Sequence, residues 1–224
     1  MFVNEFLPDN NLEQINTPNG RYYETPDGQK FYSVTTLLGW LQNDPAKKKS
    51  LEQWKQRVGE DQAGRILTQA GRRGTIIHDT LEKFLKNDPD PLKGLMPVNK
   101  ETIKPLLPIL EEHITTVYGL EHQLWSKALK ASGTADCIAL WDGELAIIDF
   151  KTARSNRNAS DILDYFYQTT AYAIMCFERH RLVINKIVIV MHIDHAKPKV
   201  FVKDTKEYAR DVINLFKQAP SVEA

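Results

Sequence analysis

The sequence is poor in cysteine and contains no long apolar run. Its 224 residues include two cysteines, too few for a disulfide framework or a thiolate-ligated cluster. No apolar stretch approaches the roughly 20 residues that a membrane-spanning helix needs. The acidic, proline-broken start over residues 1–9 resembles neither a signal peptide nor a transit peptide. These absences predict a protein of a reducing cytosolic compartment with no membrane partner.

The chain also lacks an excess of charge of either sign. It has 29 Lys and Arg against 29 Asp and Glu, so its formal net charge is zero. This balance argues against a broadly basic nucleic-acid binder. Segment 46–74, however, holds eight basic residues and three acidic ones. Any contact with a nucleic acid is therefore predicted to be local to that segment.

The first half of the chain predicts a hairpin followed by helices. Length fits one large domain or a core with a helical insert. We divide the chain into an N-terminal hairpin and basic helical region (residues 1–98) and a core (99–224), together one compact unit. The elements predicted before the core strands are strands 21–25 and 29–36, a basic helix capped by Asp44 and ending near 58, a short helix 60–67, a helix capped by Thr75 and broken at 87–91, and a helix ending near 118.

The second half predicts a mixed sheet. Patterns of apolar and β-branched residues predict strands at 120–129, 132–140, 147–152, 186–193 and 200–202, with a turn at 141–144 and helices at 160–179 and 204–217. A three-strand meander followed by a crossover helix and a parallel strand gives a mixed sheet with helices on its faces. The predicted fold class is therefore α/β, in the sense of an α+β mixed sheet.

Two acids and a lysine gather at one end of a predicted hairpin. Asp149 and Lys151 are two positions apart at the end of an apolar strand, so they share one side of it. The Asp142-Gly143 turn folds the preceding strand back and brings Asp136 near Asp149. Carboxylates held together in this way suit a hard divalent cation. A plain ion pair at a strand end is the alternative for Asp149 and Lys151.

The order of these residues resembles the PD-(D/E)xK nuclease superfamily. The matching series is His78 with Glu82, Gly133-x-x-Asp136, Asp149-x-Lys151 and Gln168-x-x-x-Tyr172. Because His78 precedes the hairpin, the series resembles in particular the RecB-like exonuclease branch of this superfamily. Segments 33–36 and 73–78 are similar to the mitochondrial genome maintenance exonuclease and its phage relatives. The resemblance implies a restriction-endonuclease-like core with an N-terminal helical arch.

The resemblance also implies a role for each matched position. The implied ligands of Mg²⁺ or Mn²⁺ are His78, Asp136, Asp149 and the carbonyl of Phe150. The implied catalytic residues are Asp136, Asp149, Lys151 and Glu121. Lys151 would orient the attacking water or stabilise charge on the phosphate, and Glu121 would face a second metal or water. The implied substrate-binding residues are Gln168, Tyr172, Arg72, Arg73, Thr75, Thr152, Ser33 and Thr35.

The implied activity is metal-dependent hydrolysis of DNA by an exonuclease that prefers single-stranded ends. The basic helices over 46–74 would cover the cleft, in the cytosol of a bacterium or a phage-infected host. Replication or recombination partners stay open. The alternatives are a flap or junction endonuclease of the same fold and a non-catalytic nucleic-acid-binding module. Structural roles also stay open for His78 with Glu82, for Glu121, and for Gln168 with Tyr172. His192 and His195 are predicted to face opposite sides of their strand and to form no metal site.

Overall fold

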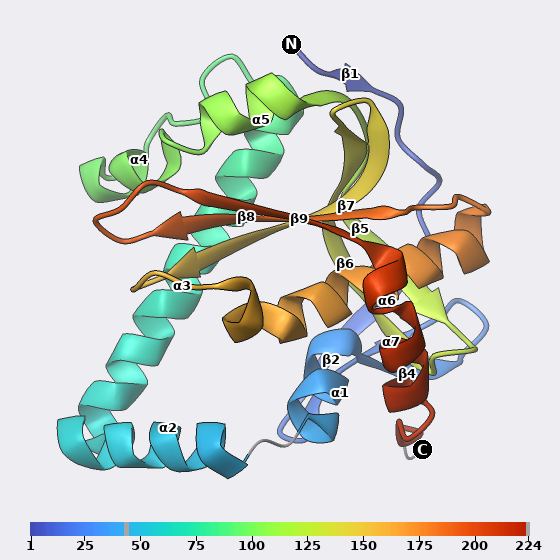
Figure 1. Cartoon of the computed structure of the whole chain (residues 1–224), viewed down its shortest axis with the longest axis horizontal. Coiled ribbons are helices and arrows are strands. Elements are labelled where there is room, and N and C mark those ends of the chain that lie inside the picture. Colours follow the sequence, from blue (N-terminus) through green and yellow to red (C-terminus); the bar gives the residue numbers. More distant parts are fainter. Residues whose placement is uncertain (43–44, 223–224) are drawn as a thin grey trace.

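One mixed sheet organises the molecule (Figure 1). The computed structural model describes residues 1–42 and 45–222, so the predicted cap at Asp44 lies outside the described residues. Within those ranges nine strands share the sheet, in the order β2-β3-β4-β6-β7-β8-β9, with β5 on β6 and β1 on β5. The strands are β1 (Val3–Asn4), β2 (Glu13–Thr17), β3 (Gly20–Glu24), β4 (Lys30–Ser33), β5 (Ile114–Ser126), β6 (Ala131–Trp141), β7 (Glu144–Ala153), β8 (Lys186–Ile193) and β9 (Lys199–Asp204).

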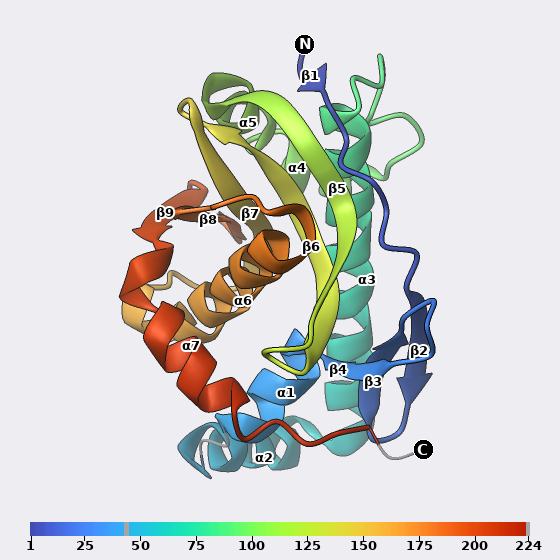
Figure 2. The same ribbon diagram turned by 90° about the vertical axis from the view of Figure 1, so that its right-hand side faces the viewer.

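Helices cover both faces of this sheet (Figure 2). They are α1 (Val34–Leu41), α2 (Pro45–Val58), α3 (Glu60–Leu85), α4 (Pro97–Ile103), α5 (Leu107–His113), α6 (Leu163–His180) and α7 (Ala209–Phe216), with 3-10 turns η1 (Ala159–Ile162) and η2 (Thr205–Glu207). One apolar core joins α1, α6 and α7 to the sheet, which we call the α6 side. A second core joins α3, α4 and α5 to the opposite face, the α3 side. The mixed α/β architecture predicted from the sequence is therefore confirmed.

The predicted hairpin and crossover position the central strands. Asp142 and Gly143 both have positive φ, 51° and 78°, as a two-residue type I′ turn requires. Strand β7 then pairs with β8 in parallel through the helix α6. No helix in the described ranges combines the length and the apolar character that crossing a bilayer demands.

Strands β4 and β7 use the same edge of β6 at different points. β4 pairs in parallel with Ala131 and Ser132, whereas β7 pairs with β6 from Cys137 onward. Residues 133–136 lie between these two ladders, and β5 pairs along the other edge of β6. We call this gap the strand fork, formed by residues 133–136 of β6 and 149–151 of β7. The sheet takes strands from both predicted regions, and their division at residue 98 stays a prediction.

The helix that carries His78 is longer than predicted. Residues 60–85 form the single helix α3, whereas the sequence predicted two helices separated by a glycine turn. Thr75 does not cap a helix: its hydroxyl donates to the carbonyl of Gly71 one turn earlier. Glycine inside a helix is unfavourable by about 1 kcal/mol relative to alanine. The apolar stripe of Ile77, Leu81 and Leu85, buried against the sheet, outweighs that penalty.

The segment at 33–36 was predicted as a strand end and is a helix start. The Ser33 side chain accepts a hydrogen bond from the backbone N–H of Thr36 at 3.1 Å, which caps α1. Val34, Leu37 and Leu38 then follow with helical spacing and are buried. The β-branched composition of the segment favours a strand, but the cap and the apolar spacing decide the outcome.

The segment before β5 was predicted as one helix ending near residue 118. It forms the two short helices α4 and α5, and the strand begins at Ile114. Pro105 and Pro108 divide the helical part, and the β-branched run from Ile114 to Val117 favours a strand. Gly119 lies inside β5 and ends no helix. The predictions also missed β1 and β2 and placed the starts of α6 and α7 a few residues early.

Candidate active site

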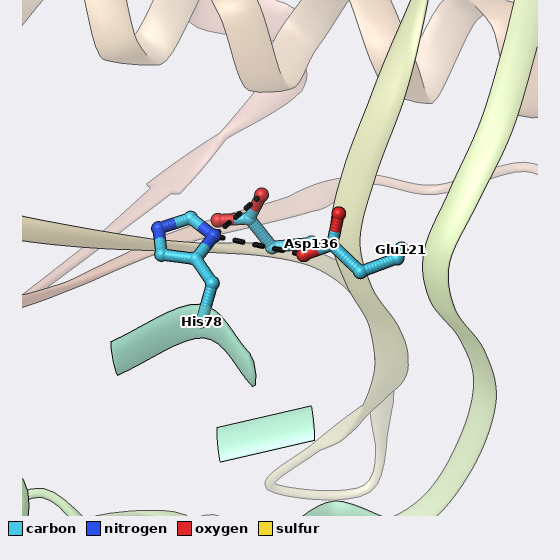
Figure 3. A group of neighbouring side chains, drawn as sticks. All are labelled: His78, Glu121 and Asp136. Carbon is cyan, nitrogen blue, oxygen red and sulfur yellow. Dashed lines mark ion pairs between the residues drawn. The ribbon is translucent and has the colours of Figure 1, made fainter. Parts of the chain in front are cut away.

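Three potential metal ligands meet at the strand fork (Figure 3). His78 comes from α3, Glu121 from β5 and Asp136 from β6, and one ligand atom of each lies within 4.8 Å of the others. His78 Nδ1 is 3.6 Å from a carboxylate oxygen of Glu121 and 3.5 Å from one of Asp136. The other ring nitrogen of His78 is 2.9 Å from the carbonyl oxygen of Phe150. Four of the predicted site residues therefore converge.

An irregularity in two strands turns both carboxylates towards α3. Glu121 lies opposite Asp136, because the residues on either side of them pair with one another. Glu121 has a φ of 45°, a left-handed conformation that a non-glycine residue rarely adopts. On β6, Ala135 and Ile138 both pack on the α6 side, although residues three apart face opposite sides of a regular strand. Such backbone strain costs about 1–3 kcal/mol and is concentrated at functional sites.

Asp149 and Lys151 form the second part of the fork. The Asp149 side chain is 1% exposed, and Lys151 Nζ lies 2.8 Å and 2.7 Å from its two oxygens. Asp149 is outside the three-residue cluster and is joined to it through Phe150. The backbone N–H of Phe150 donates to Asp136 at 2.8 Å, and its carbonyl meets His78. The predicted pairing of Asp149 with Lys151 on one side of β7 is confirmed.

Helix α6 supports Asp149 with two further predicted residues. The Gln168 amide donates to Asp149 Oδ1 at 3.2 Å and to the Tyr172 hydroxyl at 3.4 Å. Tyr172 packs directly on Gly133 of β6, where an added Cβ would stand 2.8 Å from the ring and 2.9 Å from the hydroxyl oxygen. Glycine at 133 therefore lets α6 approach the fork closely enough for Gln168 to reach Asp149.

The charges at the fork perturb one another. Burial lowers the pKa of His78, but hydrogen bonds that its ring donates to Asp136 and Glu121 outweigh this effect and raise the pKa to about 10. Burial raises the pKa of Asp149 to about 7, although Lys151 opposes that rise. Burial also disfavours the charged form of Lys151, yet Asp149 and Asp136 together keep its pKa above the usual range. The site therefore concentrates negative charge that a proton on His78 and the Lys151 ammonium balance.

The residues present fit a hard divalent cation. Two carboxylates, a third nearby and a backbone carbonyl supply the oxygens that Mg²⁺ and Mn²⁺ prefer. Asp149 Oδ2 is buried and accepts no well-aligned hydrogen bond despite the nearby Lys151. A buried oxygen left without a hydrogen bond is unfavourable unless a cation or water completes it.

The remaining predicted residues lie around the fork at various depths. Arg73 forms an ion pair with Asp194, which directly follows β8. The Arg73 guanidinium also lies 3.5 Å from the Thr102 hydroxyl and lines a hollow of about 770 Å³. Thr152 is half-buried on β7, opposite His192. The Ser33 hydroxyl is buried at the start of α1, 3.1 Å from the exposed Thr35 hydroxyl; Arg72 and Thr75 are exposed on α3.

Two contacts near the site escaped the sequence reasoning. Tyr165 places its ring centroid 5.1 Å from Lys151 Nζ. It precedes Gln168 by three residues and Tyr172 by seven, so helical spacing could have revealed it. Arg73 and Asp194 are 121 residues apart, and no local pattern indicates their pairing.

About half of the chain is similar in sequence to a known exonuclease. The chain is 32% identical over 125 residues to the mouse (Mus musculus) mitochondrial genome maintenance exonuclease 1. The resemblance predicted from the motifs is confirmed. The match covers 54% of this chain, and the chain spans only about a third (36%) of the length of that curated relative. The match alone therefore does not assign the activity of the whole mouse protein to this chain. No family model matches the chain.

A solved structure shows a looser likeness. It is a crystal structure from Eubacterium rectale whose name marks it as a candidate exonuclease. The TM-score is 0.44 and the identity 9%, over 66% of this chain and 64% of the other. A likeness at this level carries no weight for function, which must be argued from the strand fork.

Proposed function

We propose that the chain is a Mg²⁺- or Mn²⁺-dependent DNA exonuclease that hydrolyses phosphodiester bonds and prefers single-stranded ends. The observation that carries the proposal is the strand fork, where His78, Glu121 and Asp136 meet beside the buried Asp149–Lys151 pair. The similarity to an exonuclease over half of the chain supports the same reaction class. Its cytosolic location and its protein partners stay predictions from the sequence.

The proposed mechanism assigns each group a task. Asp136, Asp149 and the Phe150 carbonyl would hold the cation, with His78 completing one side and Glu121 facing it from β5. A cation bound there would lower the pKa of a bound water and polarise the phosphoryl oxygen. The Lys151 ammonium would orient the attacking water and stabilise the negative charge that develops on the phosphate. Gln168 and Tyr172 would fix the direction of the Asp149 carboxylate.

The preference for single strands rests on helices α2 and α3. The N-terminal half of α3 and the attached α2 extend away from the strands of the sheet (Figure 1). Both segments carry exposed basic side chains. The exposed basic residues there are Lys48, Lys49, Arg57, Arg65 and Arg72. Phosphates of a single strand would contact this extension while its end reaches the fork. Duplex DNA is wider and stiffer than a single strand, so we expect its ends to reach the strand fork less readily.

The proposal is tested with labelled DNA of defined ends. Linear single-stranded, linear double-stranded and covalently closed circular single-stranded DNA are incubated with Mg²⁺, and each reaction is repeated with chelator. We expect stepwise loss of nucleotides from the linear single strand, slower attack on the duplex, intact circles and no reaction with chelator. Efficient cutting of circles would identify an endonuclease instead. Binding without Mg²⁺-dependent cleavage would leave a non-catalytic nucleic-acid-binding module.

The Asp149→Asn variant controls for contaminating nuclease. The amide keeps the size of the side chain while removing the charge that the cation requires. Cleavage by the parent protein and not by this variant, purified in the same way, assigns the activity to the strand fork.

A further inference from the structure

Helix α6 presents a stripe of three side chains to the strand fork. Tyr165, Gln168 and Tyr172 follow at spacings of three and four, which places them on one face of the helix. Tyr172 packs on Gly133, and Gln168 donates to Asp149. Tyr165, nearest the start of α6, places its ring over the Lys151 ammonium at 5.1 Å. Tyr165 therefore contacts the lysine of the fork, as Gln168 contacts the acid.

The surroundings of Lys151 make this contact consequential. The Lys151 side chain is 20% exposed, and both oxygens of Asp149 lie within 2.8 Å of its ammonium. These are the oxygens that the proposed function assigns to a divalent cation. A carboxylate that binds a cation attracts a neighbouring ammonium less strongly, and the cation repels that ammonium directly. Lys151 then needs a second group to keep its ammonium at the fork.

An aromatic ring supplies such a hold without competing for the cation. The face of a tyrosine ring attracts an ammonium through its quadrupole, and the attraction is stronger where water is excluded. The ring offers no charged oxygen that would draw the cation away from Asp149. Tyr165 is half-buried, so its ring is partly shielded from water.

We propose that Tyr165 is a positioning residue that holds Lys151 at the strand fork through its aromatic face when Asp149 binds the cation. This inference rests on the proposed function, since it concerns the same reaction. The ring is the active part, and the hydroxyl is dispensable. Tyr165 acts through Lys151 and contacts neither cation nor substrate.

Kinetics of matched variants test the proposal. Tyr165→Phe keeps the ring, Tyr165→Leu removes it, and Tyr167→Leu removes a neighbouring ring that faces Asp211 on α7. From the usual strength of such contacts, Tyr165→Leu is expected to lower kcat about 3- to 30-fold with little change in KM. Tyr165→Phe should retain most of the parent kcat, as should Tyr167→Leu. Equal losses in Tyr165→Phe and Tyr165→Leu would overturn the role of the ring.

A double-mutant cycle separates positioning from general support of the fold. In a Lys151→Ala background, measured in single turnovers with excess protein, Tyr165→Leu should have almost no further effect. If the ring only stabilised α6, its removal would lower the rate by the same factor in the parent and in the Lys151→Ala background. That additive result would contradict the proposal.

Spectroscopy gives a readout that needs neither cation nor activity. Lysine labelled with ¹³C at Cε is incorporated, and the Lys151 signal is assigned by its loss in Lys151→Arg. An aromatic ring this close should shift the attached protons upfield in the parent and in Tyr165→Phe, but not in Tyr165→Leu. An unchanged signal in Tyr165→Leu would refute the contact. If the parent protein shows the shift but cleaves no DNA, the proposed function is contradicted. If the parent cleaves DNA and Tyr165→Leu has the same kcat, only the role of Tyr165 is contradicted.

Discussion

Substituting Gly133 with alanine should damage the site from a position that makes no polar contact with it. An added Cβ would stand 2.8 Å and 2.9 Å from the Tyr172 ring and hydroxyl, closer than real Cβ atoms approach their neighbours. Tyr172 is buried and cannot simply swing into solvent. Either α6 moves away from β6 or the Tyr172 ring leaves its rotamer, and both changes withdraw Gln168 from Asp149.

The size of the effect follows from the overpacking. Extra methyl groups in well-packed cores destabilise by about 1–3 kcal/mol. For a chain of this length, each kcal/mol corresponds to roughly 2–4 °C in the melting temperature. Loss of the Gln168 hydrogen bond to the Asp149 carboxylate removes about a further 1.5–3 kcal/mol of positioning, if cleavage depends on it. We therefore expect kcat to fall by about 10-fold or more.

Thermal unfolding and single-turnover cleavage measure the two effects separately. Gly64→Ala in α3 is the matched control, because a Cβ there meets no atom within 4 Å. It should raise stability by about 0.5–1 kcal/mol through helix propensity and leave cleavage unchanged. A Gly133→Ala protein with the parent melting temperature and the parent kcat would refute the reasoning, since it would show that Tyr172 does not need the space.

Three further predictions concern charged groups. Asp149→Asn and Lys151→Ala should each lower turnover by at least ~10²-fold while circular dichroism shows an intact fold, because both residues act on the transition state; near-normal cleavage by either variant would remove the proposed site. The pKa of His78 is about 10 in the folded protein, above the value of ~6.5 for an unfolded histidine. Protonation of His78 therefore stabilises the metal-free fold fully below pH ~6.5, and this stabilisation is lost as the pH rises through 10. Mn²⁺ must displace that proton, so the affinity of the protein for Mn²⁺, measured by calorimetry, should rise from pH 6 to pH 9 in the parent and rise less steeply in His78→Ala. An identical dependence of affinity on pH in the two proteins would exclude His78 as a ligand. Arg73→Gln should lower stability in denaturant by up to about 1 kcal/mol, because the half-exposed pair with Asp194 is screened by solvent, and Asp194→Asn should add nothing further if the pair is the cause.

Local signals account for the parts that the sequence predicted correctly. The Asp142-Gly143 turn, the β-branched strand β8 and the spacing of Asp149 and Lys151 each depend on neighbours a few residues away. These features fixed the hairpin, its crossover helix and the ion pair at the fork. Segments whose composition favours one structure while their packing favours another were predicted wrongly. Ser33 caps a helix within a β-branched run, and Ile114 begins a strand that was expected to continue a helix.

The remaining features depend on tertiary contacts that no short pattern encodes. The left-handed conformation of Glu121 lies within β5, opposite Asp136 on β6, and no local sequence signal marks it. The pairing of Arg73 with Asp194 joins α3 to the end of β8 across most of the chain. Tyr165 differs from these, because its spacing from Gln168 and Tyr172 was present in the sequence.

The central claim is that the strand fork holds the cation on which cleavage depends. Anomalous diffraction from crystals soaked in Mn²⁺ tests it most directly, with crystals of Asp149→Asn as the comparison. We expect an anomalous peak in the parent bounded by His78, Asp136, Asp149 and the Phe150 carbonyl, and a weaker or absent peak in the variant. A fork without a peak at Mn²⁺ concentrations that support cleavage, or a peak bound elsewhere, would contradict it.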